Sequence, residues 1–180
     1  MELYTKVGEF AMLDFRNQEI IIVEALQKHL GCPVVRANQT APIPPYPYVS
    51  YTLMAPITEN KGTWGKYDDG KDRKPITQTW SITVQSDDST ESQMLSLKAH
   101  DWFDYVGTLL LTDNNIIVQS VTDINNRDNL LTIAYEYRNG FDVVFWFLNE
   151  VPAVTEATGY IEEAVINDVL YSRENENKEE

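Results

Sequence analysis

A segment with two glycines and a lysine is the first candidate for chemistry in this sequence. Gly65 to Lys71 matches the first seven positions of the phosphate-binding loop, in which backbone amides and a lysine hold nucleotide phosphates. The eighth position of that motif is Ser or Thr, which ligates magnesium, but here it is Asp72. Pro75 also lies where the phosphate-holding helix should begin. We therefore interpret the segment as the turn of a hairpin and expect no nucleotide site.

Metal and acid–base chemistry have equally weak support. Asp68, Asp69 and Asp72 could suggest calcium, but they lack the regular spacing and the distal glutamate of an EF-hand loop. The two histidines are His29 and His100, and neither belongs to a recognisable nucleophile or metal motif. The sequence therefore predicts no enzyme: we expect no catalytic residue, no metal and no cofactor.

Composition narrows the class of protein further. The 180 residues include 28 acids and 14 bases, which gives a net charge of −14. This charge disfavours nucleic-acid binding, which depends on Lys and Arg contacts to phosphates. Cys32 is the single cysteine, which excludes an internal disulfide. No apolar run approaches the roughly 20 residues that cross a bilayer, and no secretory signal opens the chain. We expect a globular protein made in the cytoplasm.

Two stretches have the periodicity of helices. In the stretch from Asp14 to Leu30, Asp14 or Asn17 can cap the start and Gly31 can close the end. A second helix should begin near Asp88 or Ser89, either of which can cap it. Its apolar stripe comprises Leu95, Ala99, Trp102, Phe103, Val106 and Leu110.

The remaining segments predict strands and connections. Between residues 76 and 86 apolar and hydroxyl side chains alternate, as in an antiparallel sheet covered on one side. Asn139-Gly140 is the preferred pair for a two-residue hairpin turn. The predicted strands are 48–54, 76–86, 116–122, 130–137, 141–148 and 161–170. A proline-rich connector at 37–47 and a polar loop at 59–74 lie between the helices and strands.

These elements predict an α+β fold with two main helices on an antiparallel sheet. We expect one domain over residues 1–172, with a long hairpin loop and the proline-rich N-terminal connector. Residues 173–180 form a charged tail that we expect to be disordered.

Aromatic residues supply the candidates for binding. The segment Val143 to Leu148 is apolar on both faces of a strand, so it is either an interior strand or part of a subunit interface. The 59–74 loop should be mobile in the free chain and order against a partner, because it has little apolar surface. The interface candidates are Trp64 and Tyr67 in this loop, Tyr46 in the connector, and Phe145, Trp146 and Phe147 in the strand.

The order of several segments resembles a known family. The segments are the proline-rich 37–42 leading into Tyr48–Tyr51, Thr79–Gln85 before an aromatic helix, and Tyr135–Arg138 followed by Phe141–Val143. Over residues 15–170 this order resembles the neck or tail-terminator (tail completion) proteins of tailed bacteriophages. The 59–74 loop departs from the family pattern.

This resemblance implies a structural protein that forms a ring, usually a hexamer. The ring would cap the tail tube and join it to the head connector, with the genome passing through the lumen without specific binding. We would then expect self-association and contacts with tail tube and connector proteins. We would expect no membrane, and a place in the virion neck after synthesis in the bacterial cytoplasm.

Two other functions stay open on the sequence alone. A small-ligand or carbohydrate-binding module could use Trp64, Tyr67 and Trp146 as stacking surfaces. A hydrolase with an unrecognised pair of acids is a weaker third possibility, because only the separation of two carboxylates in space is diagnostic. Mass measurement separates the first two hypotheses, since a ring favours the phage protein and a sugar-stabilised monomer favours the binding module.

Overall fold

A computed structural model of the chain describes residues 13–38, 40–59, 64–130, 135–153, 163–166 and 169–172. The helical elements are α1 Phe15–Leu30, α2 Ser89–Asp101, the π-helix η1 Trp102–Val106, and α3 Thr108–Asp113. The longer strands are β1 Val34–Arg36, β2 Tyr48–Glu59, β4 Lys71–Ser86, β5 Ile117–Val121 and β8 Tyr135–Pro152. The shorter ones are β3 Gly65–Lys66, β6 Asn125–Asn126, β7 Asn129–Leu130, β9 Glu163–Ile166 and β10 Val169–Ser172.

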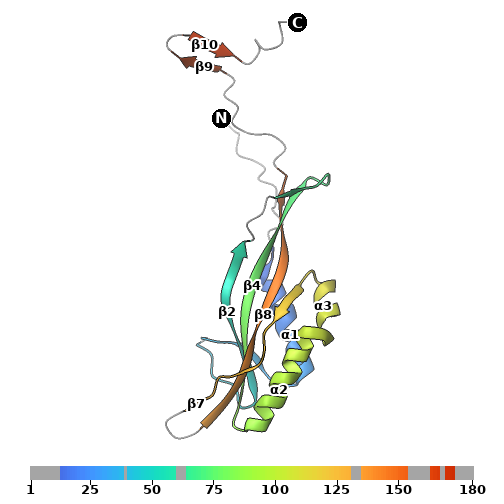
Figure 1. Ribbon diagram of the computed structural model, residues 1–180, viewed down its shortest axis with the longest axis vertical. Coiled ribbons are helices and arrows are strands. Elements are labelled where there is room, and N and C mark those ends of the chain that lie inside the picture. The colour runs from blue at the N-terminus through green and yellow to red at the C-terminus, as the bar shows by residue number, and fades with distance from the viewer. Residues whose placement is uncertain are drawn as a thin grey trace.

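One large sheet organises these elements. Its strand order is β1-β2-β4-β8-β5, with β3 paired to β4 and both β6 and β7 paired to β8. The β1–β2 pair is parallel and the other pairs are antiparallel. The helices lie along one face of this sheet (Figure 1), which confirms the α+β fold. β9 and β10 form a separate antiparallel pair where one last strand was expected at 161–170; β10 extends past that range to Ser172.

The long strands extend past the helices at one end (Figure 1). We call this projecting part the arm and define it as residues 54–59, 64–75 and 148–152. Here β4 lies between β2 with β3 on one side and β8 on the other. Apart from Pro152, the described residues of β4 and β8 in the arm are half-buried or buried, and Leu148 and Glu150 line a cavity with the start of α1.

Local signals set the first helix as expected. The Asp14 carboxylate accepts a hydrogen bond from the Asn17 amide at 3.0 Å, which caps the start of α1. Gly31 ends the helix with a φ of 78°, a left-handed conformation that glycine adopts without steric cost. Ile22 and Leu26 are buried against the sheet, so the apolar stripe of α1 is its packing face.

The core lies between the helices and the odd-numbered residues of β8. Phe145 is fully buried and contacts Trp80 at a ring-centroid distance of 5.2 Å and Phe103 at 5.8 Å. Trp80 also stacks on Tyr51 at 4.8 Å. These edge-on and stacked pairs tie β2, β4, β8 and η1 into one aromatic cluster.

The second helix differs from the expected stripe after Trp102. Residues 102–106 form a π-turn in which the Gly107 amide donates to the Trp102 carbonyl at 2.7 Å, five residues back. The extra residue in the π-turn rotates the residues that follow it around the helix axis. Leu111 is therefore fully buried where Leu110 was expected, and Val106 is 56% exposed. The expected stripe is thus wrong at Val106 and Leu110.

The predicted turn at Asn139-Gly140 is also wrong. Both residues lie inside β8, where Asn139 pairs with Val84 and Gly140 with Thr83. A Cβ on Gly140 would lie 2.4 Å from the Ile82 carbonyl oxygen and 2.8 Å from Arg127 Nη1. The glycine is there because neighbouring atoms approach the backbone closely. β7 pairs antiparallel with the start of β8, and residues 131–134 between them lie outside the described residues.

Of the described residues of the polar 59–74 segment, 59, 65–66 and 71–74 lie in strands, where a loop was expected. β2 continues to Glu59, Gly65 pairs with Arg73, and β4 begins at Lys71. The turn is limited to residues 67–70, where Gly70 has a φ of 77°. Ion pairs between strands replace the apolar contacts that a strand pattern usually shows, which hid these strands in the sequence. The 173–180 tail lies outside the described residues.

Candidate protein interface

Trp64 and Tyr67 lie on the arm, and each ring has a cation from its own chain over it. The Arg73 guanidinium is 4.6 Å from the Tyr67 ring centroid, and Lys74 Nζ is 5.9 Å from that of Trp64. These cation–π contacts hold the rings against β4. Tyr67 is still 52% exposed, so part of its ring is available to a partner.

Ion pairs cross-link the tip of the arm. Glu150 accepts hydrogen bonds from Lys71 Nζ at 2.7 Å and from Arg73 Nε at 2.5 Å. These bonds, that from Lys71 first, hold the pKa of the Glu150 carboxyl below its usual range. Arg73 also pairs with Asp69, whose pKa is lowered mainly by that hydrogen bond. The hairpin tip is thus tied to β8 by charge-assisted contacts.

The strand β8 carries three further aromatic candidates of the sequence and divides them between its two faces. Phe145 and Phe147 are buried at 0% and 1% exposure in the core, so they hold the sheet to the helices. Their side chains have no free surface in this conformation, so their role as partner-binding residues stays a prediction. Trp146 points to the opposite, open face, is partly exposed and pairs with Thr77 of β4.

Tyr46 joins the proline-rich connector to the sheet. Its hydroxyl donates to Glu136 Oε1 at 2.6 Å, and its ring stacks on Tyr48 at 5.7 Å. The hydrogen bond to Glu136, with smaller contributions from burial and from the charge of that carboxylate, raises the pKa of Tyr46 to about 12. Arg138 also pairs with Glu136, which is buried, so this charge is compensated inside the fold. Tyr46 thus stabilises the fold through its hydroxyl, while part of its side chain remains exposed.

The helix layer exposes an apolar surface that sequence reasoning missed. It consists of Met94, Leu97, Tyr105, Val106, Leu109 and Leu110, which we call the helix patch. Tyr105 is 81% exposed and Leu109 is 73% exposed. The available signal was the density of apolar residues from 102 to 111, which exceeds what one face of a helix can bury.

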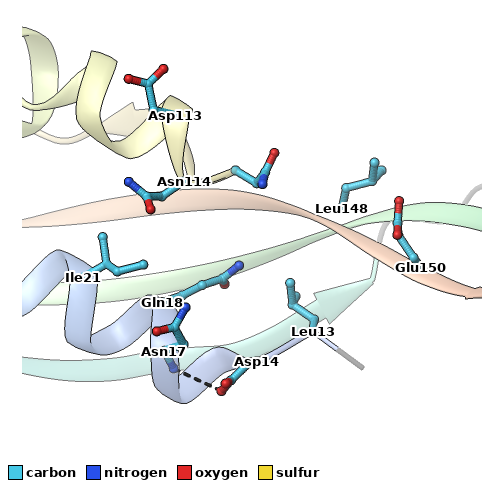
Figure 2. Close-up of a pocket in the computed structure, with 10 residues that line it drawn as sticks. Leu13, Asp14, Asn17, Gln18, Ile21, Asp113, Asn114, Leu148 and Glu150 are labelled. Atoms are coloured by element: carbon cyan, nitrogen blue, oxygen red, sulfur yellow. Dashed lines mark hydrogen bonds between the residues drawn. The ribbon is translucent and has the colours of Figure 1, made fainter. Parts of the chain in front are cut away.

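A cavity of about 470 Å³ lies between the start of α1, the end of α3 and β8 (Figure 2). Leu13, Asn17, Gln18, Asn115 and Glu150 are among its lining residues. Gln18 is 8% exposed, and its Oε1 has no hydrogen-bond partner in the described part of the chain. The cavity is rich in amides and acids and can accept hydrogen bonds from a donor. Trp64, Tyr67 and Trp146, the expected stacking residues, are not in its lining.

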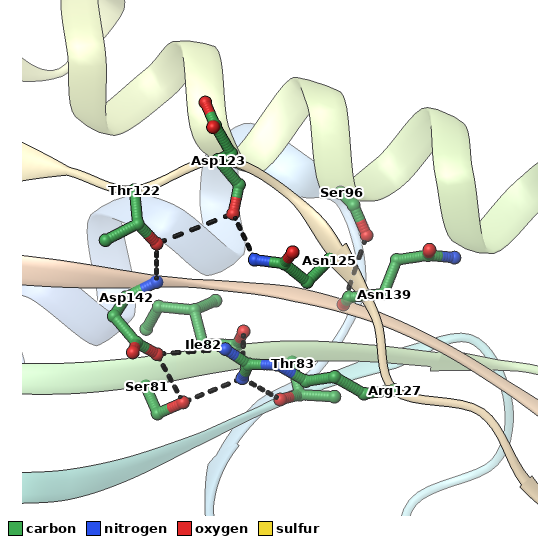
Figure 3. A network of polar contacts seen from close by, with 10 residues as sticks. All are labelled: Ser81, Ile82, Thr83, Ser96, Thr122, Asp123, Asn125, Arg127, Asn139 and Asp142. Carbon is green, nitrogen blue, oxygen red and sulfur yellow. Dashed lines mark hydrogen bonds and ion pairs between the residues drawn. The ribbon is translucent and has the colours of Figure 1, made fainter.

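A polar network holds residues 122–127, which follow the edge strand β5, to strands β4 and β8 (Figure 3). Arg127 Nη1 donates to Ser81 Oγ at 2.7 Å, and Arg127 Nη2 donates to Asp142 Oδ1 at 2.9 Å. Ser81 Oγ also donates to Asp142 Oδ1 at 2.7 Å. Thr122 Oγ1 accepts from the Asp142 amide. The Arg127 guanidinium and the Asp142 carboxylate thus have partners within the chain, which positions them against the sheet.

The glycine-rich segment lies in a hairpin, and His100 lies against the sheet. Residues 65–71 form the hairpin of β3 and β4, as the interpretation of the glycine-rich segment required. His100 packs edge-on to Phe141 at 5.3 Å, and its closest carboxylate oxygen, on Asp101, is 3.7 Å away. No group of three or more His, Cys, Asp or Glu gathers as metal ligands within the ranges described. Nor does any helix in those ranges have the length and apolarity to cross a bilayer.

An α+β subunit that exposes apolar surface on an arm and on a helix layer has the properties of an assembly protein. The chain matches the phage neck terminator protein family over residues 21–172 and belongs to that family. The role of the family is structural, in the neck and tail of the phage particle, and involves contacts with other head or tail proteins. Among curated proteins, no sequence matches the chain.

Proposed function

We propose that this chain forms a closed ring at the head-proximal end of the phage tail, where it ends the tail tube and joins it to the head connector. Family membership over residues 21–172 is the observation that carries the proposal. A subunit at this position must contact copies of itself, the tube below and the connector above. The arm, the helix patch and the open sheet face give the chain separate surfaces for such contacts.

The charge of the chain suits a ring through which DNA passes. Each copy carries −14, so copies gathered around a lumen would repel the phosphate backbone of the genome. DNA could then move through the ring without specific binding. We propose six copies, the usual number in the family that the sequence resembles, with no membrane partner and no catalytic step.

Electron microscopy of assembled particles tests this role. In phage carrying a tagged copy of the chain, gold label should lie only at the end of the tail next to the head. Label along the tube or at the distal tip would exclude a terminator role.

Deletion of the gene supplies a second test. A tube whose end is not covered continues to present its binding surface, so tails without the subunit should be abnormally long and detached from heads. Tails of normal length attached to heads would contradict the proposal. A His100→Ala variant should assemble as the unsubstituted protein does, because the histidine has no chemical role in the proposal.

A further inference from the structure

The cavity between α1, α3 and β8 contains a buried amide oxygen without a partner. Gln18 is 8% exposed, and its side chain points from α1 into the cavity toward β8 (Figure 2). Its Oε1 accepts no hydrogen bond from the described residues. Buried polar atoms usually have a partner, because an unpaired one costs free energy. The terminal amide of glutamine turns about a soft torsion, so this oxygen can be presented to a group inside the cavity.

The lining of the cavity is acidic. Its acids are Asp14, Asp113 and Glu150, and its described lining residues include no lysine, arginine or histidine. Lys71 and Arg73 already neutralise Glu150. Asp14 and Asp113 are exposed at the rim, and no described base pairs with either. A rim with two uncompensated carboxylates attracts a positively charged group.

Two lining side chains leave an oxygen available to a ligand. Asn114 Nδ2 donates to the Leu110 carbonyl at 2.8 Å, which leaves Asn114 Oδ1 as an acceptor. Asp14 accepts the Asn17 amide with Oδ1, which leaves its other oxygen. With the Gln18 oxygen, these acceptors suit a ligand that donates several hydrogen bonds. A charged donor gains more from them than a neutral one does.

The rest of the wall is aliphatic. Leu13, Ile21 and Leu148 line it. The volume of about 470 Å³ lies within the range of small-ligand sites, roughly 300–1,000 Å³, and far exceeds the volume of one water molecule, about 30 Å³. The acids of the described lining do not gather as metal ligands. An aliphatic wall beside acceptors suits a cationic head on an alkyl stem, as in lysine and arginine.

We propose that this cavity binds a guanidinium or primary ammonium group carried on an alkyl stem. Gln18 and Asn114 accept its hydrogen bonds, the acids at the rim attract its charge, and the aliphatic wall covers its stem. A small free amine and a lysine or arginine of another protein share this chemistry. The site does not depend on the proposed ring, since every residue that forms it belongs to one chain.

NMR titration of the full chain labelled with ¹⁵N tests the site. The probes are n-butylguanidinium chloride and n-butylammonium chloride. The controls are n-butanol, which has the same stem without a charge, and sodium chloride at equal ionic strength. We expect each cation, and neither control, to cause saturable shifts in the Gln18 side-chain amide and in the backbone amides of residues 13–18 and 113–115.

Substitution of Gln18 separates binding from folding. Gln18→Leu should weaken binding of both cations by about tenfold or more, because a hydrogen bond to a charged group is lost. It should not lower the thermal midpoint, because it removes a buried amide that the fold leaves unpaired. Gln18→Glu retains an acceptor and adds charge, so it should bind the cations more tightly.

A second pair of variants measures the attraction by the rim. Asp113→Asn should weaken binding by about twofold to fivefold, as expected for an exposed charge. Asp104→Asn is the matched control, because Asp104 is also exposed and does not line the cavity. This control should bind as the unsubstituted chain does.

Three results would overturn the site. They are no saturable shift with either cation, which would mean that the cavity holds water only, equal shifts with n-butanol, and equal losses in Gln18→Leu and Asp104→Asn. Where the cations do bind, phage assembly identifies the source. Gln18→Leu subunits that fail to join particles would assign the group to a protein side chain, and normal incorporation would assign it to a free amine. Label outside the head-proximal end of the tail would overturn the proposed function and leave the titration unchanged.

Discussion

The two faces of the central strand β8 differ in what lies over them. On one face Phe141, Val143, Phe145 and Phe147 are buried to 1% exposure or less beneath the helices. On the other face Asp142, Val144 and Trp146 alternate with them and are only partly covered. The odd-numbered residues of β8 thus stabilise the core, and the even-numbered residues between them present surface on the open face.

The comparison resolves an ambiguity that the sequence left open. The run from Val143 to Leu148 is apolar at every position, which is typical of a strand covered on both faces or of a subunit interface. In the described residues the helices cover only one face. Of the three aromatic residues in this run, Trp146 alone has side-chain surface open to a partner. We expect it to contact another protein in the neck.

The largest expected difference between the faces comes from neighbouring aromatic truncations. Phe145→Ala should lower the free energy of unfolding by about 3–5 kcal/mol, because it leaves a cavity among Trp80 and Phe103. Trp146→Ala should cost much less in the isolated chain and should instead reduce assembly. Denaturant unfolding of both variants gives the two values. Equal losses would show that the open face is packed as tightly as the core.

A glycine substitution tests the close approach on the open face. Gly140→Ala should lower the free energy of unfolding by about 1–3 kcal/mol, because its Cβ would lie 2.4 Å from the Ile82 carbonyl oxygen. Chemical denaturation measures the change. A neutral or stabilising result would mean that β8 and β4 can move apart here, and that the glycine is not required by packing.

The polar network of the open face should contribute less than the aromatic core. Arg127→Ala should cost about 1–2 kcal/mol, since several hydrogen bonds to a partly exposed group are lost. Hydrogen exchange should increase over residues 117–130, which this arginine holds to the sheet. Arg36→Ala is the matched control, because the Arg36 side chain is more exposed than that of Arg127 and its contact with Glu19, at 3.6 Å, is longer. Unchanged exchange in the Arg127 variant would show that the backbone ladder alone holds the edge.

The smallest effect concerns pH and Tyr46. Its pKa is raised from 10.0 to about 12, so the neutral hydroxyl stabilises the folded state below pH 10. This contribution is lost as the pH rises through about 12. Tyr46→Phe should remove that part of the alkaline loss of stability. Identical alkaline unfolding curves for both proteins would contradict the contribution of the bond to Glu136.

Local sequence signals predicted the elements better than the surfaces. The caps of α1 and the alternation of β4 were read correctly because a few neighbouring residues determine them. Asn139-Gly140 was misread as a turn because the residues that require this pair inside β8 are distant in sequence. Asn139 donates to Ser92 Oγ on α2, and Gly140 leaves room for Arg127. The helix patch was missed for a related reason, since a single π-turn changes which apolar residues face the core.

The length of β8 has a mechanical consequence. Its 18 residues run about 60 Å, from the pairing with β7 to the tip of the arm. It is paired with β4 continuously from Tyr137 to Pro152. A pull along the strand would load this whole ladder of hydrogen bonds in shear, so that they resist together and do not open one at a time. A force applied at the arm would therefore pass through the body of the subunit before any single bond failed.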